Sequence, residues 1–266
     1  MQAILATKML ARASLSLRYL VRPKPDAWVI PEGTVPESTA HDAAVLRVYL
    51  LLMQWASKQP GRVRVARNLA LRWFEEYPAS GIDPDLCVLD PAPDNFDTNL
   101  TSLCLWKPGH FIPRFCVEVV SGQHPHKDYT EVIDRYASLG VPELLVFDPL
   151  LQGPRRLGGP VALQLWRRDA TGTFERVHFS SEPVHSDMLD AWLLFEEQKL
   201  VIAEDRAGLR PWLTELEIAH ADNDRERAEK ERERAEKERE QAARIELERR
   251  VSELEAQMLG REPSTR

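Results

Sequence analysis

The pattern that most constrains the fold of this chain is a strand, a helix and a second strand in close succession. The strands are expected at residues 115–121 and 143–147, and the helix between them at residues 127–139, ending at Gly140. Two parallel strands need a crossover connection of a dozen or more residues, which is usually a helix. This succession therefore predicts an α/β fold in which helices flank a sheet.

Two of the apolar strand segments carry an acid. Asp85 stands in the segment 82–89, directly before four apolar residues, and Glu118 lies between Val117 and Val119. Burying an ionised carboxylate without a partner is expensive. Three explanations fit the sequence. The two acids could share a hard divalent cation such as Mg²⁺, each could pair with a buried arginine, or each could occupy a water-facing position of its strand.

The other segments complete the expected domain. A helix is expected at residues 41–57, because apolar residues recur at helical spacing after a Ser38-Thr39 capping signal. Residues 63–74 have the character of one or two strands, and the Pro- and Asp-rich stretch 90–99 is expected to be a loop. A hairpin is expected from 161–168 and 174–179, and the remainder to about residue 210 is expected to consist of loops and short elements.

Composition indicates one globular domain with appendages. The chain has 266 residues, 43% of them hydrophobic, and no apolar run approaches the roughly 18 residues of a membrane span. Cys87, Cys104 and Cys116 show no metal-ligand spacing and are expected to be buried thiols in a reducing cytoplasm. The first 25 residues hold five bases and no acid, which fits either an organellar transit peptide or a basic extension, but not a secretory signal.

Charge is spread unevenly. The net charge is −7, the first 25 residues contribute +5, and residues 26–221 carry about −10. An acidic body argues against a sequence-independent grip on long DNA, for which basic residues neutralise phosphates. A local basic patch on an acidic protein remains compatible with nucleic-acid binding.

The C-terminal region is a charged heptad repeat. Residues 225–231 recur as 232–238, and acids and bases three and four apart support a helix over residues 222–260. Only Val251, Leu254 and Met258 have the spacing of a coiled-coil seam. Two interpretations fit: a solvated helix that frays, or an extended helix with a weakly dimerising end that serves as a weak coiled coil.

Taken in order, the motifs resemble the PD-(D/E)XK nuclease superfamily and, within it, the Uma-type restriction endonucleases. The resemblance covers residues 28–215. Its matching pieces are 36–41 before the first long helix, Asp83-Pro-Asp85, Glu118-Val-Val-Ser121, Lys127-Asp128, 136–143 and 146–149. The resemblance implies a mixed sheet flanked by helices and a Mg²⁺-dependent DNA endonuclease, with Mn²⁺ as a possible substitute. Asp85 and Glu118 would hold the metal ion, which polarises the scissile phosphate and helps to generate hydroxide.

The resemblance also implies a lysine that completes the site, and here the chain departs from the pattern. Val120 stands two residues after Glu118, and Val132 occupies the helix position at which related sequences often carry lysine. Lys127 and Arg135 are the candidate substitutes, although an arginine stays protonated and cannot act as a base. We therefore expect Lys127 to join Asp85 and Glu118 as a catalytic side chain.

Other polar residues have competing interpretations. By the resemblance, His41 is a fourth catalytic candidate lining the cleft; it could equally be a surface residue at a helix start. Asp128 is expected to cap its helix, and Asp148, before Pro149, to shape a turn. His124 and His126 either contact substrate or belong to an unconstrained polar loop.

The expected organisation is a basic extension at 1–25, a PD-(D/E)XK nuclease-like domain at 26–215 and a charged helix at 222–260. The expected function is DNA cleavage in the cytoplasm without a membrane partner, with a homodimer or partner protein recruited by the C-terminal helix. The alternative is a catalytically inactive nuclease-fold module that binds a partner through that helix.

Overall fold

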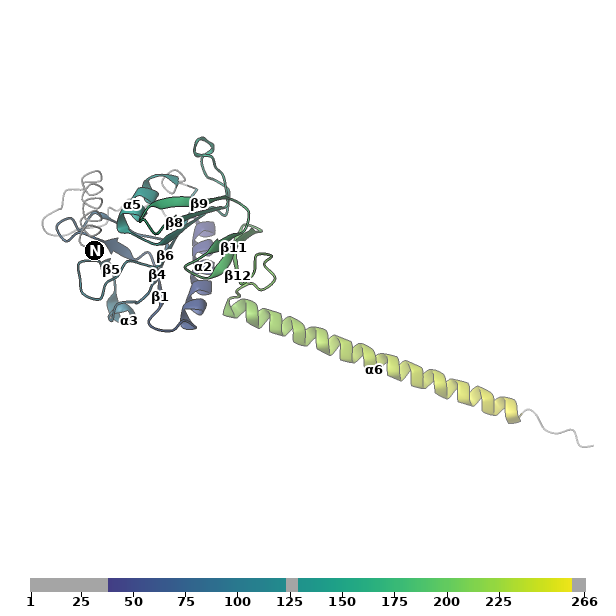
Figure 1. The fold of residues 1–266 in the computed structure, drawn as a ribbon. Helices are drawn as coiled ribbons and strands as arrows, with labels where there is room; N and C mark the ends of the chain where they lie inside the picture. The colour runs from purple at the N-terminus through teal and green to yellow at the C-terminus, as the bar shows by residue number, and fades with distance from the viewer. Residues whose placement is uncertain (1–37, 123–128, 260–266) are drawn as a thin grey trace, which may run out of the picture. The chain divides into compact units, whose positions relative to one another are not determined.

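The computed structural model describes residues 38–122 and 129–259 (Figure 1). The chain divides into two compact units, Met1–Thr214 and Glu215–Arg266. The first unit holds the sheets and the second is a single long helix, and each is described by itself.

A six-stranded mixed sheet forms the centre of the first unit, in the order β1-β4-β6-β7-β8-β9. Its strands β6 and β7 are parallel, and each of the other neighbouring pairs is antiparallel. The helix α5 (Glu131–Leu139) connects β6 to β7, so the expected crossover unit is confirmed. The strand bounds are β1 Arg64–Arg67, β4 Leu86–Leu89, β6 Phe115–Val119, β7 Glu143–Phe147, β8 Leu163–Arg168 and β9 Phe174–Ser180.

The described part of the chain holds two smaller sheets as well. Strands β2 (Ala70–Arg72), β3 (Gly81–Ile82) and β5 (Ser102–Cys104) form one of them, in the order β3-β2-β5. The other is the antiparallel sheet of β10 (Val184–Ser186), β11 (Ala191–Glu196) and β12 (Lys199–Ala203).

The expectation of loops and short elements after the hairpin is wrong for this last sheet. Its strands β11 and β12 are joined at Glu197 and Gln198, which both have positive φ, 48° and 64°. Two central residues with positive φ are the geometry of a tight hairpin turn, which is normally signalled by Asn-Gly or Asp-Gly. A Glu-Gln pair gives no such signal in the sequence.

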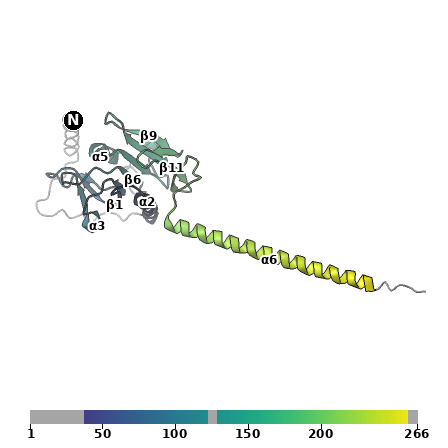
Figure 2. The ribbon, with the colours of Figure 1, turned by 60° about the horizontal axis from the view of Figure 1, so that its bottom comes forward.

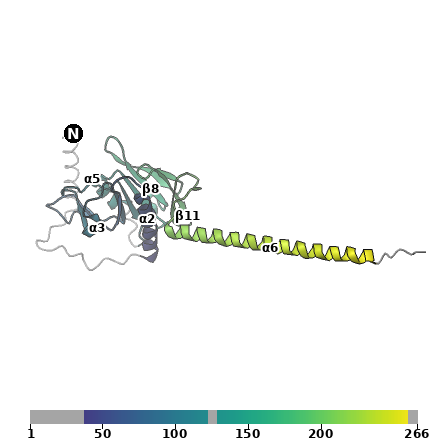
Figure 3. The same cartoon turned by 90° about the horizontal axis from the view of Figure 1, so that it is seen from below.

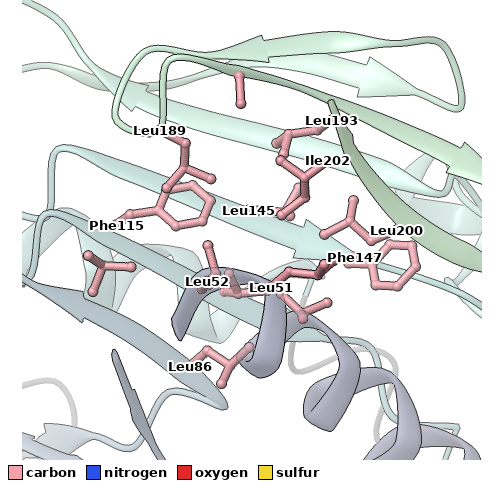
Figure 4. Close-up of a cluster of buried hydrophobic side chains, with 14 of the residues drawn as sticks. Leu51, Leu52, Leu86, Phe115, Leu145, Phe147, Leu189, Leu193, Leu200 and Ile202 are labelled. Carbon is pink, nitrogen blue, oxygen red and sulfur yellow. The ribbon is translucent and has the colours of Figure 1, made fainter. Parts of the chain in front are cut away.

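Helix α2 (Thr39–Ser57) begins as expected, because the Ser38 hydroxyl accepts a hydrogen bond from the backbone N–H of His41 at 3.2 Å. Its buried face meets one side of the central sheet and the sheet of β10 to β12. Figure 4 shows Leu51 and Leu52 of α2 pointing toward Leu145 and Phe147 of β7, with side chains of β11 and β12 closing the cluster.

Helix α5 covers the opposite side of the central sheet. Its Val132, Tyr136 and Leu139 belong to a second core cluster, together with Cys87 of β4 and Cys116 of β6. Figure 2 shows the central strands between α5 and α2, and Figure 3 shows the same arrangement from below. Because β4 and β6 are covered on both faces, every residue in them is buried, which accounts for their nearly continuous apolar sequences.

Two short helices lie in connections. The stretch 90–99, expected to be a loop, ends in the four-residue helix α3 (Phe96–Asn99). A 3₁₀ turn, η1 (Arg155–Leu157), precedes β8 and ends at Gly158 in the left-handed conformation. Both are too short for helical periodicity to reveal them.

The second unit is helix α6 (Glu215–Leu259), which begins at Glu215 rather than at residue 222. Ion pairs four residues apart run along it, including Glu226–Lys230 and Glu233–Lys237, both at 2.6 Å. No helix among the described residues is long and apolar enough to cross a membrane. The expected fold, a mixed α/β domain followed by a charged C-terminal helix, is confirmed.

Candidate functional site

Glu118 lies in β6, and Asp85 directly precedes β4, the antiparallel neighbour of β6 in the central sheet. The ladder between β4 and β6 ends at the pair of Leu86 with Val117, and Asp85 and Glu118 are the residues that adjoin this last pair. Directly opposed residues in such a pair have Cα atoms about 4.5 Å to 5.5 Å apart. The two carboxylates that the sequence suggested are therefore brought together at one end of the two strands.

The position of Asp85 differs from the expectation in one respect. The strand expected over residues 82–89 is broken, because β3 ends at Ile82 and β4 begins only at Leu86. Asp85 stands at the bend between them, directly after Pro84, which has no N–H to donate to a strand ladder. The backbone carbonyl of Asp85 still accepts a hydrogen bond from the N–H of Asn68 at 3.2 Å, which fixes the bend.

Both carboxylate residues are buried. Asp85 is 8% exposed and Glu118 is 4% exposed, so the explanation that each occupies a water-facing strand position is wrong. Burial makes each carboxylate dependent on hydrogen-bond donors or positive charge.

Asp85 is held by a backbone N–H and by His41. Its Oδ2 accepts a hydrogen bond from Val119 N at 2.7 Å, and the Nε2 atom of His41 lies 3.3 Å from the same oxygen. The Nε2 atom also lies 3.0 Å from the carbonyl oxygen of Val119. Both neighbours of Nε2 are acceptors, so this nitrogen carries a hydrogen and donates. His41 is 5% exposed, which excludes the interpretation as a surface residue.

Glu118 is held by a residue to which the sequence analysis gave no role. The phenol of Tyr136 on α5 donates to Oε1 of Glu118 at 2.5 Å. Burial, followed by the charge of Glu118, raises the pKa of Tyr136 well above its ordinary value, so the phenol stays protonated. Tyr136 follows Val132 by one helical turn, and this spacing was the only available signal that it faces the sheet.

The lysine of the expected site is not found at either usual position. Val120 and Val132 are both buried, 3% and 1% exposed, within the core cluster beneath α5. The substitute Arg135 donates from Nη1 to the carbonyl of Gly81 at 3.2 Å, which ties its guanidinium to β3. Lys127 lies outside the described residues, as do Asp128, His124 and His126.

A cavity of about 220 Å³ reaches the carboxylate end of the sheet beside the start of α2. Across it, Arg67 pairs with Asp42 at 2.8 Å. The cavity is lined by His41, Asp42, Val45, Arg67, Asn68 and Asp85. Water and small solutes can thus reach Asp85 from the side of the sheet that α2 covers.

Asp85 and Glu118 offer carboxylate oxygens, the kind of ligand that hard cations such as Mg²⁺ accept. Within residues 38–122 and 129–259, no group of three or more His, Cys, Asp or Glu side chains could hold a metal ion. Zinc sites use three or four protein ligands, whereas Mg²⁺ keeps several waters and needs only one or two carboxylates. Asp85 and Glu118 supply that smaller set.

Asp148 organises the turn after β7, the role that its position before Pro149 suggested. Its carboxylate accepts hydrogen bonds from the backbone N–H groups of Gln152 and Gly153 at 2.9 Å and 2.8 Å. The phenol of Tyr129 lies 3.3 Å from Oδ2 of the same carboxylate. These bonds fix the connection that leads to η1.

A third buried acid, Glu143, links neighbouring strands through its hydrogen bonds. Its Oε2 accepts from Arg167 Nε of β8 at 2.9 Å, and Ser186 of β10 donates to its other oxygen. Arg167 also donates to the carbonyl of His185 at 2.9 Å. Burial raises the pKa of Glu143, and the bonds from Ser186 and Arg167 offset part of that rise. The pair connects β7 and β8 of the central sheet with β10.

A mixed sheet with a helical crossover, with buried Glu118 in β6 and buried Asp85 directly before β4, places the first unit among α/β proteins. More specifically, the chain belongs to the Uma2 family of putative restriction endonucleases, whose model matches residues 22–184. This confirms the family resemblance drawn from the ordered motifs.

Among solved structures, the chain is similar to a putative nuclease of the DUF820 group from Anabaena variabilis ATCC 29413. The sequence identity is 14% and the TM-score is 0.40, with 65% of this chain and 88% of that chain covered. None of the curated proteins matches the chain.

Proposed function

We propose that this protein is a divalent-metal-dependent endonuclease that hydrolyses phosphodiester bonds in DNA. The observation that carries the proposal is the pair of buried carboxylates, Glu118 in β6 and Asp85 directly before β4. Membership of a family of restriction-type endonucleases supports the same reaction. A domain that only binds a partner has no need to bury two acids side by side, because their mutual repulsion and desolvation cost stability.

In this proposal Asp85 and Glu118 bind Mg²⁺, with Mn²⁺ as a substitute. When bound, the ion would supply a Lewis acid for the scissile phosphate and lower the pKa of a coordinated water. The chain's own groups orient the two carboxylates. The Val119 N–H and His41 Nε2 hold Oδ2 of Asp85, and the Tyr136 phenol, which keeps its proton, holds Oε1 of Glu118.

His41 therefore acts through Asp85 and not as a metal ligand at Nε2. That nitrogen carries a hydrogen directed at the Asp85 carboxylate and the Val119 carbonyl, and a protonated nitrogen cannot coordinate a cation. Lys127 is proposed as the cation that offsets negative charge on the phosphate, a contribution that electrostatic stabilisation requires.

The first test is nicking of supercoiled plasmid in Mg²⁺ or Mn²⁺. The wild-type protein should convert plasmid to the open-circular form, while Asp85→Asn and Glu118→Gln should reduce the rate by about 100-fold or more. Asp83→Asn is the matched control, because Asp83 pairs with Arg72 at 2.6 Å and not with the site. Lys127→Ala should also slow cutting, while leaving Mn²⁺ affinity measured by calorimetry unchanged. Cutting by the Asp85 and Glu118 variants at the wild-type rate would refute the assignment.

A second candidate function is a catalytically inactive nuclease-fold module. The observation that favours it is the presence of Val120 and Val132 in the core, where related sites use a lysine. This candidate requires that the wild-type protein binds Mn²⁺ at Asp85 and Glu118 yet cuts no DNA. Plasmid nicking and calorimetry together separate the two functions.

We also propose that α6 mediates self-association. Leu247, Val251 and Leu254 are spaced four and three residues apart and are 65%, 46% and 50% exposed. A spacing of four and three residues is that of a coiled-coil seam. Sedimentation should show a dimer that Leu254→Asp converts to monomer, whereas Ser252→Asp, off the seam, should not. Three free cysteines are compatible with a cytoplasmic location for this assembly.

A further inference from the structure

Another cavity of the first unit lies between the connection that follows β4 and the connection that precedes β6. Its volume is about 530 Å³, within the range of about 300–1,000 Å³ that ligand pockets have. We propose that this cavity, called the loop cavity below, binds a nucleoside 5′-phosphate, with Lys107 and His110 at the phosphate and Phe111 at the base.

The loop cavity is separate from the carboxylates. Asp85 directly precedes β4 and Asp90 directly follows it, so the five residue steps between them span about 17 Å. The carboxylate pair lies at the first of these two ends, and the loop cavity lies at the second. The inference therefore concerns a binding site beyond the proposed function.

Hydrogen bonds hold the two walls of the loop cavity. One wall follows β4 and includes Pro93, and the other is formed by residues 107–111. Arg62 holds the first wall, because its Nη2 donates to the carbonyl of Pro93 at 2.8 Å. Arg114 pairs with Asp90 at 3.0 Å, which ties the two connections together where they leave the sheet. The loop cavity is thus bounded by backbone that is fixed in place.

The second wall contains a tight turn at Lys107-Pro-Gly-His110. The backbone N–H of His110 donates to the carbonyl of Lys107 at 3.2 Å, and Gly109 has a φ of 78°. Proline at the second position and a glycine with positive φ at the third are typical of a type II turn. The first and last residues of the turn, Lys107 and His110, both line the loop cavity.

His110 offers one N–H donor to a ligand. Its Nδ1 accepts a hydrogen bond from the backbone N–H of Cys104 at 3.0 Å, so the hydrogen of the neutral ring is on Nε2. Burial, followed by the charge of Lys107, lowers the pKa of His110, which keeps the ring neutral at pH 7. Among the residues that the structure describes, none accepts a hydrogen bond from this Nε2.

Lys107 gives the loop cavity a positive charge. It is exposed, and no acid within residues 38–122 and 129–259 forms an ion pair with its ammonium group. Its effect on the pKa of His110 indicates that the ammonium group lies near the imidazole. Residues 26–221 carry about −10, so an unpaired cation marks a place where an anion can bind. An ammonium group beside a neutral N–H donor suits phosphate oxygens.

Phe111 adds an aromatic surface to the same wall. Its side chain is 52% exposed, although the residue lines the cavity. Exposed aromatic rings are surfaces on which bases stack, whatever the base. Phosphate donors and a stacking surface together are the combination that a nucleoside 5′-phosphate requires. A ligand without a base would leave Phe111 unused, and a ligand without phosphate would leave Lys107 unused.

The test is binding of 2′-deoxyadenosine 5′-monophosphate to the full chain in EDTA, measured by calorimetry. Lys107→Gln and Phe111→Ala should each weaken binding by about 10-fold. Both side chains are exposed, so both variants should keep the wild-type melting temperature. Lys199→Gln is the matched control, because Lys199 is an exposed lysine of β12 that does not line the loop cavity. Deoxyadenosine and deoxyribose 5-phosphate should each bind at least about 10-fold more weakly than the nucleotide.

A second probe, a 5′-phosphorylated single-stranded oligonucleotide, distinguishes the two sources of such a ligand. Tighter binding of the oligonucleotide, weakened by Lys107→Gln, assigns the loop cavity to the end of a nucleic-acid strand. Equal binding of the two probes assigns it to the free nucleotide.

The outcomes also separate this inference from the nuclease assignment. Asp85→Asn should leave the affinity for the nucleotide unchanged, whether or not the wild-type protein nicks plasmid. Failure of the wild-type protein to bind either probe overturns the inference. Affinities that are unchanged in both Lys107→Gln and Phe111→Ala overturn it as well, and equal binding of deoxyadenosine and its monophosphate overturns the phosphate contact.

Discussion

His41 and Asp85 join the start of α2 to the end of the central sheet, with Nε2 of the histidine 3.3 Å from Oδ2 of the aspartate. The same nitrogen lies 3.0 Å from the carbonyl of Val119, the residue whose N–H donates to Asp85. One imidazole therefore fixes both the carboxylate and the strand segment that holds it.

Replacing this imidazole should weaken metal binding through Asp85. His41→Ala is expected to lower the stability by about 1–3 kcal/mol, because buried acceptors lose their donor. Affinity for Mn²⁺ should fall by about 10- to 100-fold, as is usual when a supporting hydrogen bond to a ligand is removed. His41→Gln, which keeps an N–H donor, should recover part of the affinity. Urea unfolding and calorimetry give the two quantities, and Asp42→Ala is the exposed control. Lost stability with unchanged Mn²⁺ affinity would show a purely structural role.

Tyr136→Phe removes the hydroxyl that donates to Glu118 while preserving the ring. The variant should lose about 1–3 kcal/mol of stability, because Glu118 remains buried without this donor. Ultraviolet titration should show that the variant lacks one phenol that resists ionisation in the wild type, because burial and the charge of Glu118 raise the pKa of Tyr136. Equal stability of the two proteins would contradict the hydrogen bond.

Val132→Lys tests whether the missing lysine limits cleavage. Val132 stands one helical turn before Tyr136, so the two share a face of α5, and Tyr136 reaches Glu118. An ammonium group at this position should raise the nicking rate by about 10-fold or more through stabilisation of the phosphate charge. Val132→Met is the control for added volume without charge. Equal nicking rates in the two variants would show that the site does not respond to a cation there.

The Glu143–Arg167 pair should be essential for stability, although it lies outside the proposed site. Arg167→Met leaves a carboxylate with no exposed surface and is expected to cost about 3–5 kcal/mol. Because the folded-state pKa of Glu143 is raised above 4.5, unfolding releases its proton, and stability falls as pH rises above 4.5. The stability lost by Arg167→Met relative to the wild-type protein should therefore be smallest at low pH. Urea titrations of both proteins at several pH values measure this difference. Glu143→Gln in the same chain should remove this pH dependence.

Alkaline pH should destabilise the fold through a buried thiol. Burial raises the pKa of Cys87 from 9.0 to about 12, so the folded chain keeps a proton that the unfolded chain releases. Stability then falls between pH 9 and 12, by up to about 1.4 kcal/mol per pH unit from this group. Denaturation curves at pH 8 to 11 should show a shallower decline in Cys87→Ala. An identical decline in both proteins would refute the contribution.

The parts of the fold that the sequence predicted are those with strong local patterns. The α2 face, the β6–α5–β7 crossover and the β8–β9 hairpin each combine a regular apolar spacing with a clear start or stop signal. The sheet of β10 to β12 was missed because its turn is formed by Glu197 and Gln198, which have positive φ. Glutamate and glutamine are not the residues that usually indicate such a turn. The break between β3 and β4 was missed because Asp83-Pro84-Asp85 looks in the sequence like the opening of the strand that continues through Leu86 to Leu89.

The sequence predicted only those site residues that are acids within apolar segments. Asp85 and Glu118 could be found because acids in apolar strands are costly, whereas their supporting groups carry no such signal. In the sequence, Tyr136 looks like any residue on the apolar face of a helix. Only the folded crossover places its hydroxyl next to Glu118. The Arg167 partner of Glu143 comes from a strand later in the chain, and no local pattern links the two residues.

The length of α6 has a mechanical consequence. Its residues are almost all exposed, and the helix is supported by ion pairs along its own surface rather than by packing. Its 45 residues hold their two ends about 67 Å apart while the helix is intact. Surface ion pairs weaken with salt. The separation of the two ends of α6 should therefore depend on ionic strength, because the ion pairs that support the helix weaken as salt is added.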